Sequence, residues 1–453
     1  MPMRRRLAAR CYVAVTLSTA ALLAGCSTAP RTVRADESAV EALAARGYGG
    51  GARAPLERSH VGWTREDSRI DGELVAPAGD GALPWVLYLP GLGESASAGR
   101  AWREAWARGG YAVLSLQPLA ADASAWSSAQ ARAGEFQSLG RERFSARWTE
   151  SRLRALNDVL QEIVRRSKLQ ESPWRRLDPE RGAIAGYELG AYAAMIIAGE
   201  KMPPSLVQAG GMPASASLAL PTSATLTAPV TFRAAIALSP FAVPLPGAST
   251  GPGSVTAGRP ADPPALNAAS AATPTATATA TATASASAFK PYADVRMPVL
   301  SVTALEDSDP LSLQRSPAAR RVPFDTMPPG DKYLLMLNDA SHETMSGPTL
   351  EQLAQVAAPS RGVTEDAETG AGRRRGERRG AGMGAGGPAG PVRPSTLSGV
   401  SVSPTTQALG VTLVQGVSLA FLDATVKNDP RARAWLAQDA PRWLDGRAVL
   451  STR

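Results

Sequence analysis

Cysteine and histidine are both scarce in this sequence. The 453 residues contain only two of each. Two cysteines exclude a disulfide framework and a multi-cysteine zinc site, and two histidines leave little room for a histidine-rich metal site. No metal or organic cofactor is implied by the sequence. Long hydrophobic runs are scarce as well. No stretch of eighteen apolar residues occurs beyond the N-terminus, so we expect no internal membrane span.

A broad excess of one charge is also lacking. The formal net charge is +8, but half of it comes from Arg4, Arg5, Arg6 and Arg10 and half from the run Arg373–Arg379. The remaining body is neutral, so we expect no basic face and no nucleic-acid partner. The arginine run contains no aromatic residues and is interpreted as a solvated loop. Adhesion to anionic lipid headgroups is its functional alternative.

The N-terminal segment has the anatomy of a secretory signal. A basic start precedes an apolar run from Tyr12 to Ala24, and small residues follow. The ending LLAGC resembles the lipobox of bacterial lipoproteins. The resemblance implies a signal peptide over 1–25 and a lipidated Cys26; an uncut membrane anchor is the alternative. Ser27, where a residue other than Asp favours the outer membrane in sorted lipoproteins, implies a lipid-anchored protein of the cell envelope that faces the periplasm.

Three stretches have compositions that do not favour a packed core. Residues 26–58 are small, polar and partly glycine-rich, and predict a tether. Residues 243–288 are dominated by Ala, Thr, Pro and Ser, and residues 351–398 are rich in Gly and Arg. We expect both to be disordered insertions, because neither buries enough apolar surface to offset the entropy of ordering. They interrupt one predicted domain over 59–446.

The rest of the chain alternates strand and helix patterns. Apolar residues at helical spacing predict helices over 147–167 and 411–428. Strands buried on both faces and separated by helices are typical of an α/β fold with a mostly parallel central sheet and helices on both faces. Short apolar runs predict strands at 84–90, 111–117, 182–187, 232–240, 298–305 and 332–338.

The junction AIAGYELG, residues 183–190, has the form of a nucleophile elbow. A strand runs into Gly186, and Gly190 opens a helix. Such a strained turn presents one side chain above the strand end. The residue at this apex is Glu188 rather than Ser. The literal string G-x-S-x-G occurs at 247–251, inside an insertion with neither a strand before it nor a helix after it, so we discard that match.

Backbone donors for an oxyanion are predicted on both sides of this apex. The loop LPGLG, residues 89–93, follows the strand at 84–90 and offers the N–H of Leu92. The second candidate donor is the N–H of Leu189, directly after the apex.

An acid and a histidine follow later in the chain. Asp307 comes directly after the strand at 298–305, and His342 follows the strand at 332–338. Asp309 competes with Asp307 as the acid. We prefer Asp307, because it is nearer the strand end and a short hydrogen bond to an imidazole is easier from there.

These segments together resemble the α/β-hydrolase superfamily, most closely its dienelactone-hydrolase and platelet-activating-factor-acetylhydrolase-like branch. The resemblance is carried by LPGLG, GYELG, EDSD, ASHETMSG and a final helix, in this order. It implies hydrolysis of an ester, lactone or related small electrophile, with Glu188, His342 and Asp307 as the working set. The matching regions are roughly 60–242, 291–350 and 399–446.

Glu188 leaves three uses of such a site open, because a Glu cannot perform the chemistry of a Ser. In the first use, Glu188 is a carboxylate nucleophile, as Asp is in the haloalkane-dehalogenase and epoxide-hydrolase branches, and a His-activated water then cleaves the ester. In the second use, Glu188 is a general base for direct attack by water. Alternatively the fold is catalytically inactive, Glu188 forms an ion pair with protonated His342, and the protein serves as a binding or envelope-scaffold protein.

Overall fold

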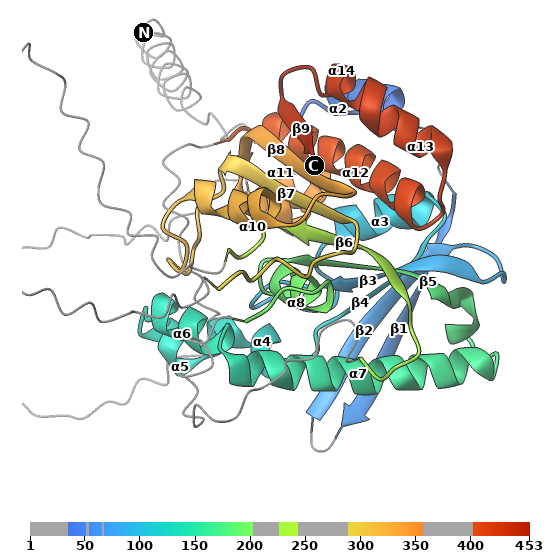
Figure 1. The fold of residues 1–453 in the computed structure, drawn as a ribbon, viewed down its shortest axis with the longest axis vertical. Helices are drawn as coiled ribbons and strands as arrows, with labels where there is room; N and C mark the ends of the chain where they lie inside the picture. Colours follow the sequence, from blue (N-terminus) through green and yellow to red (C-terminus); the bar gives the residue numbers. More distant parts are fainter. Residues whose placement is uncertain (1–34, 51–53, 66–67, 203–225, 243–288, 357–401) are drawn as a thin grey trace, which may run out of the picture.

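Nine strands form a single mixed sheet in the computed structural model, which describes residues 35–50, 54–65, 68–202, 226–242, 289–356 and 402–453 (Figure 1). Helices flank this sheet, so the α/β class predicted from the sequence is confirmed. The strands are β1 (Leu56–Arg65), β2 (Ser68–Pro77), β3 (Leu83–Leu89), β4 (Ala112–Leu116), β5 (Leu177–Tyr187), β6 (Phe232–Leu238), β7 (Val299–Glu306), β8 (Lys332–Ser341) and β9 (Ala448–Thr452).

The strand order is β1-β2-β4-β3-β5-β6-β7-β8-β9. Strands β3 to β8 are parallel, whereas β2 pairs antiparallel with β1 and β4, and β9 pairs antiparallel with β8. The chain passes from β3 outward to β4 on one side and from β5 to β6 on the other. The order therefore reverses between β3 and β5. In open α/β sheets, ligands bind outside the carboxyl ends of the strands at such a point.

Both faces of the central sheet are buried. Along β3, Trp85, Leu87 and Leu89 belong to one hydrophobic core, and Val86 and Tyr88 belong to the other. This alternation follows from the two-residue period of a strand. Helices α7 (Ala146–Lys168) and α8 (Leu189–Ile197) contribute to the first core, whereas α2 (Glu37–Arg46), α3 (Arg100–Arg108) and α12 (Pro404–Thr425) contribute to the second. The shorter helices are α4 (Ala120–Ala123), α5 (Ala129–Arg132), α6 (Phe136–Arg143), α10 (Val322–Thr326), α11 (Leu350–Val356), α13 (Pro430–Ala434) and α14 (Ala440–Leu444).

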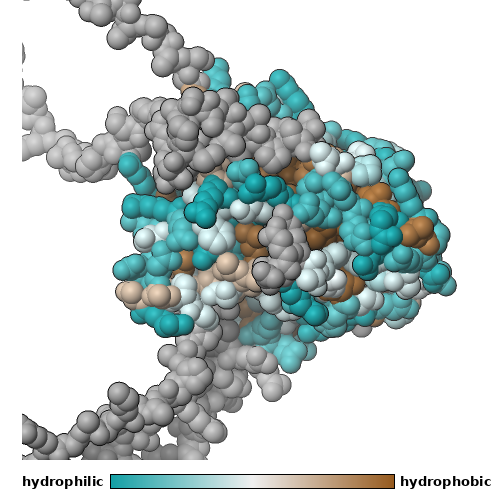
Figure 2. All heavy atoms as spheres, turned by 90° about the horizontal axis from the view of Figure 1, so that it is seen from below, coloured by the Kyte–Doolittle hydropathy of each residue, from teal (hydrophilic) through white to brown (hydrophobic). Residues whose placement is uncertain are grey.

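Helix α12 is long and apolar enough to cross a membrane by length and composition alone, but 89% of its apolar window is buried inside this fold. It packs against α2, α3 and β8 as a core helix. On the visible face in Figure 2, hydrophilic side chains cover much of the described surface and hydrophobic residues lie in separate patches. The large exposed hydrophobic residues in the described ranges come from different parts of the chain: Leu169, Leu305, Leu350 and Val449.

Three predicted boundaries differ from the structure. The predicted tether 26–58 contains helix α2, which Asp36 caps through a hydrogen bond from the Ala39 N–H, and also the start of β1. Helix α2 is anchored because it buries Leu43. Strand β9 lies beyond the predicted domain end at 446, and α11 occupies the first residues of the predicted insertion 351–398. Residues 1–34, including Cys26, and 243–288 lie outside the described residues.

Candidate active site

Glu188 stands at a strained turn between β5 and α8. Its backbone has φ 50° and ψ −105°, a conformation that non-glycine residues rarely adopt. The flanking glycines make this turn feasible. A Cβ on Gly190 would lie 1.9 Å from the Leu89 carbonyl oxygen, and a Cβ on Gly186 would lie 2.2 Å from the Gly190 carbonyl carbon. Close packing of β3, β5 and α8 therefore requires glycine on both sides of Glu188.

The two oxygens of the Glu188 carboxyl have different surroundings. Oε2 accepts a hydrogen bond from the Leu92 N–H at 3.2 Å, while Oε1 is buried without a hydrogen-bond partner. The N–H of Leu189, the first residue of α8, has no acceptor within the helix. The structure thus brings together Glu188, Leu92 and Leu189, the apex and the two predicted donor positions.

The environment of Glu188 disfavours its charged form. Burial raises the pKa of this carboxyl to about 8, and the negative charges of Asp309 and Glu94 act in the same direction. The Leu92 N–H and the guanidinium of Arg320 oppose the rise. A buried carboxyl with a pKa near the operating pH is suited to acid–base or nucleophilic work, because both protonation states are accessible.

Gln117 and the backbone of Asp122 hold the loop that carries Leu92 through hydrogen bonds. The Gln117 side-chain amide donates to the carbonyl oxygens of Gly91, at 3.2 Å, and Glu94, at 3.1 Å. The Gly93 N–H donates to the Asp122 carbonyl at 2.8 Å. The Leu92 N–H is therefore fixed in direction before any ligand binds, as an oxyanion donor must be.

His342 and Asp307 form a buried pair at the ends of β8 and β7. The distance from His342 Nδ1 to Asp307 Oδ1 is 2.7 Å. Burial alone would raise the pKa of Asp307, but Arg320 and the hydrogen bonds from His342 and Thr303 hold it at about 2. An ionised carboxylate only accepts hydrogen bonds, so Nδ1 is the donor to Asp307, and in the neutral form of this imidazole Nε2 is the basic nitrogen.

Asp309, the competing acid, has a different place. Its carboxylate accepts hydrogen bonds from three backbone N–H groups of the following loop, those of Leu311, Leu313 and Gln314. The geometry thus pairs His342 with Asp307 and gives Asp309 the role of a loop cap. His60, the second histidine, lies exposed in the edge strand β1.

Two residues of this site were not identified from the sequence. Ser239, at the end of β6 with φ 51°, lies 2.8 Å from Asp307 Oδ1 and 2.9 Å from His342 Nδ1. Arg320 is buried, and its guanidinium lies 3.1 Å from Asp307 Oδ1. It also donates to the carbonyl oxygens of Ser239 and Pro240. Ser239 could have been identified from its position at a strand end, whereas nothing in the sequence marks Arg320 as a site residue.

Glu188 and His342 do not pair directly. In the part of the chain that the structure describes, no hydrogen bond or ion pair joins the two side chains, so the ion pair expected for an inactive site is not formed. The Tyr187 ring lies against the imidazole, with 5.3 Å between ring centroids, and its hydroxyl donates to the His342 carbonyl. His342 is thus held by its ring face, its backbone and Nδ1.

Within the described ranges, no group of three or more His, Cys, Asp and Glu side chains is placed to hold a metal ion. The discarded string at 247–251 and the arginine run at 373–379 fall outside those ranges. No family model matches the chain, and a search of curated proteins gives no match either.

Proposed function

We propose that this chain is an enzyme of the α/β-hydrolase fold that cleaves a small electrophile through Glu188. One observation carries the proposal. The Glu188 carboxyl has one oxygen on the Leu92 N–H and the other without a partner, at the same sheet edge as a preformed His342–Asp307 pair. The chain order of apex, acid and histidine, at the ends of β5, β7 and β8, supports the fold assignment.

This difference between the two oxygens of Glu188, one hydrogen-bonded and one not, suits a carboxylate nucleophile. Deprotonated Glu188 attacks an electrophilic carbon through Oε1, and the leaving group departs with the electron pair of the broken bond. The product is a glutamyl ester whose carbonyl oxygen is Oε2, the atom that already accepts from Leu92. A haloalkane forms such an ester with release of halide. An epoxide forms one by ring opening, in which its oxygen stays on the product and takes a proton from water. An ester or lactone is cleaved more simply if Glu188 acts as a base toward water.

The second half of the reaction uses His342. Its Nε2 removes a proton from water, and the oxygen adds to the Glu188 carboxyl carbon while Asp307 stabilises the imidazolium. Negative charge then develops on Oε2, where Leu92 donates. Collapse expels the product alcohol, which takes its proton from His342 and retains the original Oε1 atom. Glu188 is left as a carboxylic acid with one oxygen from water, and it loses the remaining proton to solvent water to regain its carboxylate.

An activity panel tests this proposal. The wild-type chain, Glu188→Ala, Glu188→Gln and His342→Ala are assayed against epoxides, haloalkanes, short acyl esters and lactones. The proposal predicts turnover of one class by the wild type and its loss in all three variants. A His60→Ala variant, which changes the exposed histidine of β1, is the matched control and keeps wild-type activity.

A catalytically inactive binding protein is the second candidate, and the same carboxyl favours it. Glu188 sits where the oxygen of a bound ligand would accept from Leu92, and both Glu188 and His342 are more than nine-tenths buried. This alternative predicts an inert wild type, and gain of esterase activity in Glu188→Ser. That variant would place a hydroxyl at the apex of an otherwise complete site.

We further propose that Cys26 is lipidated and holds the domain at an envelope membrane. Because helix α2 is already packed and is capped by Asp36, ten residues at most separate the lipid from the folded domain. A fully extended tether of this length spans at most about 36 Å. Metabolic labelling with a fatty acid in wild type and Cys26→Ala tests the anchor. Label that persists in the variant contradicts it.

A further inference from the structure

Ser239, like Glu188, stands at the end of a parallel strand with a positive φ. The two strands, β6 and β5, pair directly, and the two φ angles are 51° and 50°. A side chain at such a φ costs free energy, so it persists where the surrounding structure holds it. The Ser239 N–H donates to the Val302 carbonyl at 2.8 Å, and the Ser239 carbonyl accepts from Arg320 at 3.1 Å. The fold therefore fixes the direction of the Ser239 side chain.

This backbone places the Ser239 hydroxyl between the acid and the imidazole of the candidate site. Its Oγ lies 2.8 Å from Asp307 Oδ1 and 2.9 Å from His342 Nδ1, and the side chain is fully buried. Because Asp307 is ionised, the hydroxyl donates its proton to Oδ1, and a lone pair of Oγ is left for the Nδ1–H. The Nδ1–H thus has two acceptors, of which the carboxylate is the nearer at 2.7 Å.

Thr303 makes the matching contact on the other oxygen of the same carboxylate. Its hydroxyl, also buried, donates to Asp307 Oδ2 at 2.7 Å. Ser239 and Thr303 therefore each give one hydrogen bond to Asp307. Of these two hydroxyls, the one that also contacts the His342 ring is that of Ser239.

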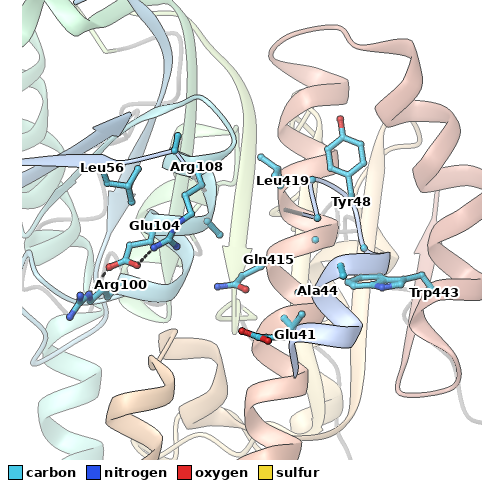
Figure 3. A pocket seen from close by; sticks show the side chains of 18 of the residues that line it. Glu41, Ala44, Tyr48, Leu56, Arg100, Glu104, Arg108, Gln415, Leu419 and Trp443 are labelled. Carbon is cyan, nitrogen blue, oxygen red and sulfur yellow. Dashed lines mark hydrogen bonds and ion pairs between the residues drawn. The ribbon is translucent and has the colours of Figure 1, made fainter. Parts of the chain in front are cut away.

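The charges of this cluster are shielded from solvent. The Arg320 guanidinium, 3.1 Å from Asp307 Oδ1, is 1% exposed. The cavity of about 790 Å³ between α2, α3 and α12 gives a contrast, because its residues Arg100 and Arg108, which pair with Glu104, are 49% and 41% exposed (Figure 3). Water and salt weaken such exposed pairs. A buried group that loses a partner cannot turn to bulk water instead, so each contact in the buried cluster matters more.

We propose that Ser239 is a positioning residue of the candidate active site, whose hydroxyl holds the Asp307 carboxylate and the His342 ring in their mutual geometry. Its effect on turnover rests on the proposed function. When Nε2 takes a proton from water, the imidazole becomes cationic and both of its N–H groups donate. The Nδ1–H then needs an acceptor that stays in place. The bond from Ser239 to Oδ1 restrains that oxygen, and Oγ adds a second acceptor beside it.

Proton NMR of the full chain, with its histidines labelled with nitrogen-15, tests this role without a substrate. The sequence has two histidines, so each ring gives one set of signals, and the exposed His60 is the internal reference. In the wild type the Nδ1–H of His342 is expected to exchange slowly with water, because it is buried and hydrogen-bonded. Ser239→Ala is expected to speed this exchange about tenfold or more, the equilibrium equivalent of one hydrogen bond to a charged group.

Thr303→Val is the matched control, since it removes a hydroxyl from the same carboxylate without removing a contact at Nδ1. It is expected to speed the exchange less than Ser239→Ala does, while thermal unfolding shows a similar loss of stability in the two variants. Ser239→Gly is the second test variant. Glycine favours the positive φ and lacks the hydroxyl, so a faster exchange in this variant assigns the effect to the hydroxyl rather than to a strained backbone.

Three exchange results overturn the proposal: fast exchange of the His342 Nδ1–H in the wild type, an unchanged rate in both Ser239 variants, or an equal increase in Thr303→Val. Turnover is a separate readout. Ser239→Ala is expected to lower kcat about tenfold with little change in KM, and an unchanged kcat in an active enzyme overturns the proposal as well. An inert wild type contradicts the proposed function, and the exchange rates then still decide the role of Ser239.

Discussion

The Glu188 carboxyl oxygen Oε2 accepts a hydrogen bond from the backbone N–H of Leu92, 3.2 Å away across the β3–β5 junction. This N–H is one of the two that the sequence predicts as oxyanion donors. The Glu188 side chain therefore already accepts the hydrogen bond that this N–H would otherwise donate to an oxyanion. In the proposed ester mechanism the same oxygen develops the negative charge, so the contact serves both the resting and the reacting states.

Stability should depend on pH through Glu188. Its pKa is about 8 in the folded protein, against an ordinary value of 4.5, so the folded state holds the proton more tightly than the unfolded state does. This contribution is complete below about pH 4.5 and is lost as pH rises toward 8. Urea unfolding of Glu188→Gln across this range should show a variant that gains a few kcal/mol over the wild type as pH rises. A constant difference between the two would contradict the buried, protonated state.

Arg320 should be essential for the Asp307–His342 pair. Arg320→Met removes the buried guanidinium 3.1 Å from Asp307 and leaves that buried carboxylate without the positive charge of the arginine. We expect a loss of about 3–5 kcal/mol in unfolding free energy, the usual cost of breaking a buried ion pair. Arg175→Met, which removes an exposed ion pair with Asp80, should cost less than about 1 kcal/mol. Similar losses in the two variants would be evidence against this role of Arg320.

Gly190→Ala should disrupt the apex. The added Cβ would meet backbone atoms of Leu89 and Pro90, which belong to the neighbouring strand and its loop and cannot move aside cheaply. We expect a destabilisation of several kcal/mol, or a shift of α8 that abolishes activity. Gly81→Ala is the control, since nothing lies within 4 Å of the Cβ it would add. Thermal unfolding of both variants measures the effect, and a Gly190→Ala protein as stable as Gly81→Ala would refute the packing argument.

Gln117 should act as a positioning residue for the oxyanion donor. Gln117→Leu removes the amide that holds the carbonyls of Gly91 and Glu94, and so frees the Leu92 loop. We expect kcat to fall about tenfold or more with little change in KM, because the donor matters most in the transition state. Gln137→Leu, which loses an exposed hydrogen bond to the Ser312 carbonyl, is the control. A change confined to KM would assign Gln117 to substrate binding instead.

The sequence predicted the central sheet well, because strands buried on both faces form continuous apolar runs. It predicted β3 and the other parallel strands through β8. It did not predict β1 and β2. Among the described side chains of β1, Trp63 is the one that is buried, and β2 carries Asp71 and Glu73 among its apolar residues. Helix α2 also escaped prediction: among its ten residues, Leu43 is the one that is buried, so its pattern is weak.

The candidate site was predictable only where position along a strand identified a residue. Glu188, Asp307 and His342 each follow an apolar run, and the structure gathers them at one sheet edge. Arg320 has no such marker. Its neighbour Arg321 has the same side chain and lies exposed beside Asp325, and tertiary packing alone distinguishes the two.

Oxygen-isotope labelling tests the central claim most directly. The full chain, in excess over the substrate found in the activity panel, completes a single turnover in water enriched in oxygen-18, and mass spectrometry locates the label. The ester mechanism predicts one labelled oxygen in the peptide that contains Glu188 and an unlabelled first product. Label in the product and none in Glu188 would show that water attacks the substrate directly and would contradict a glutamyl ester.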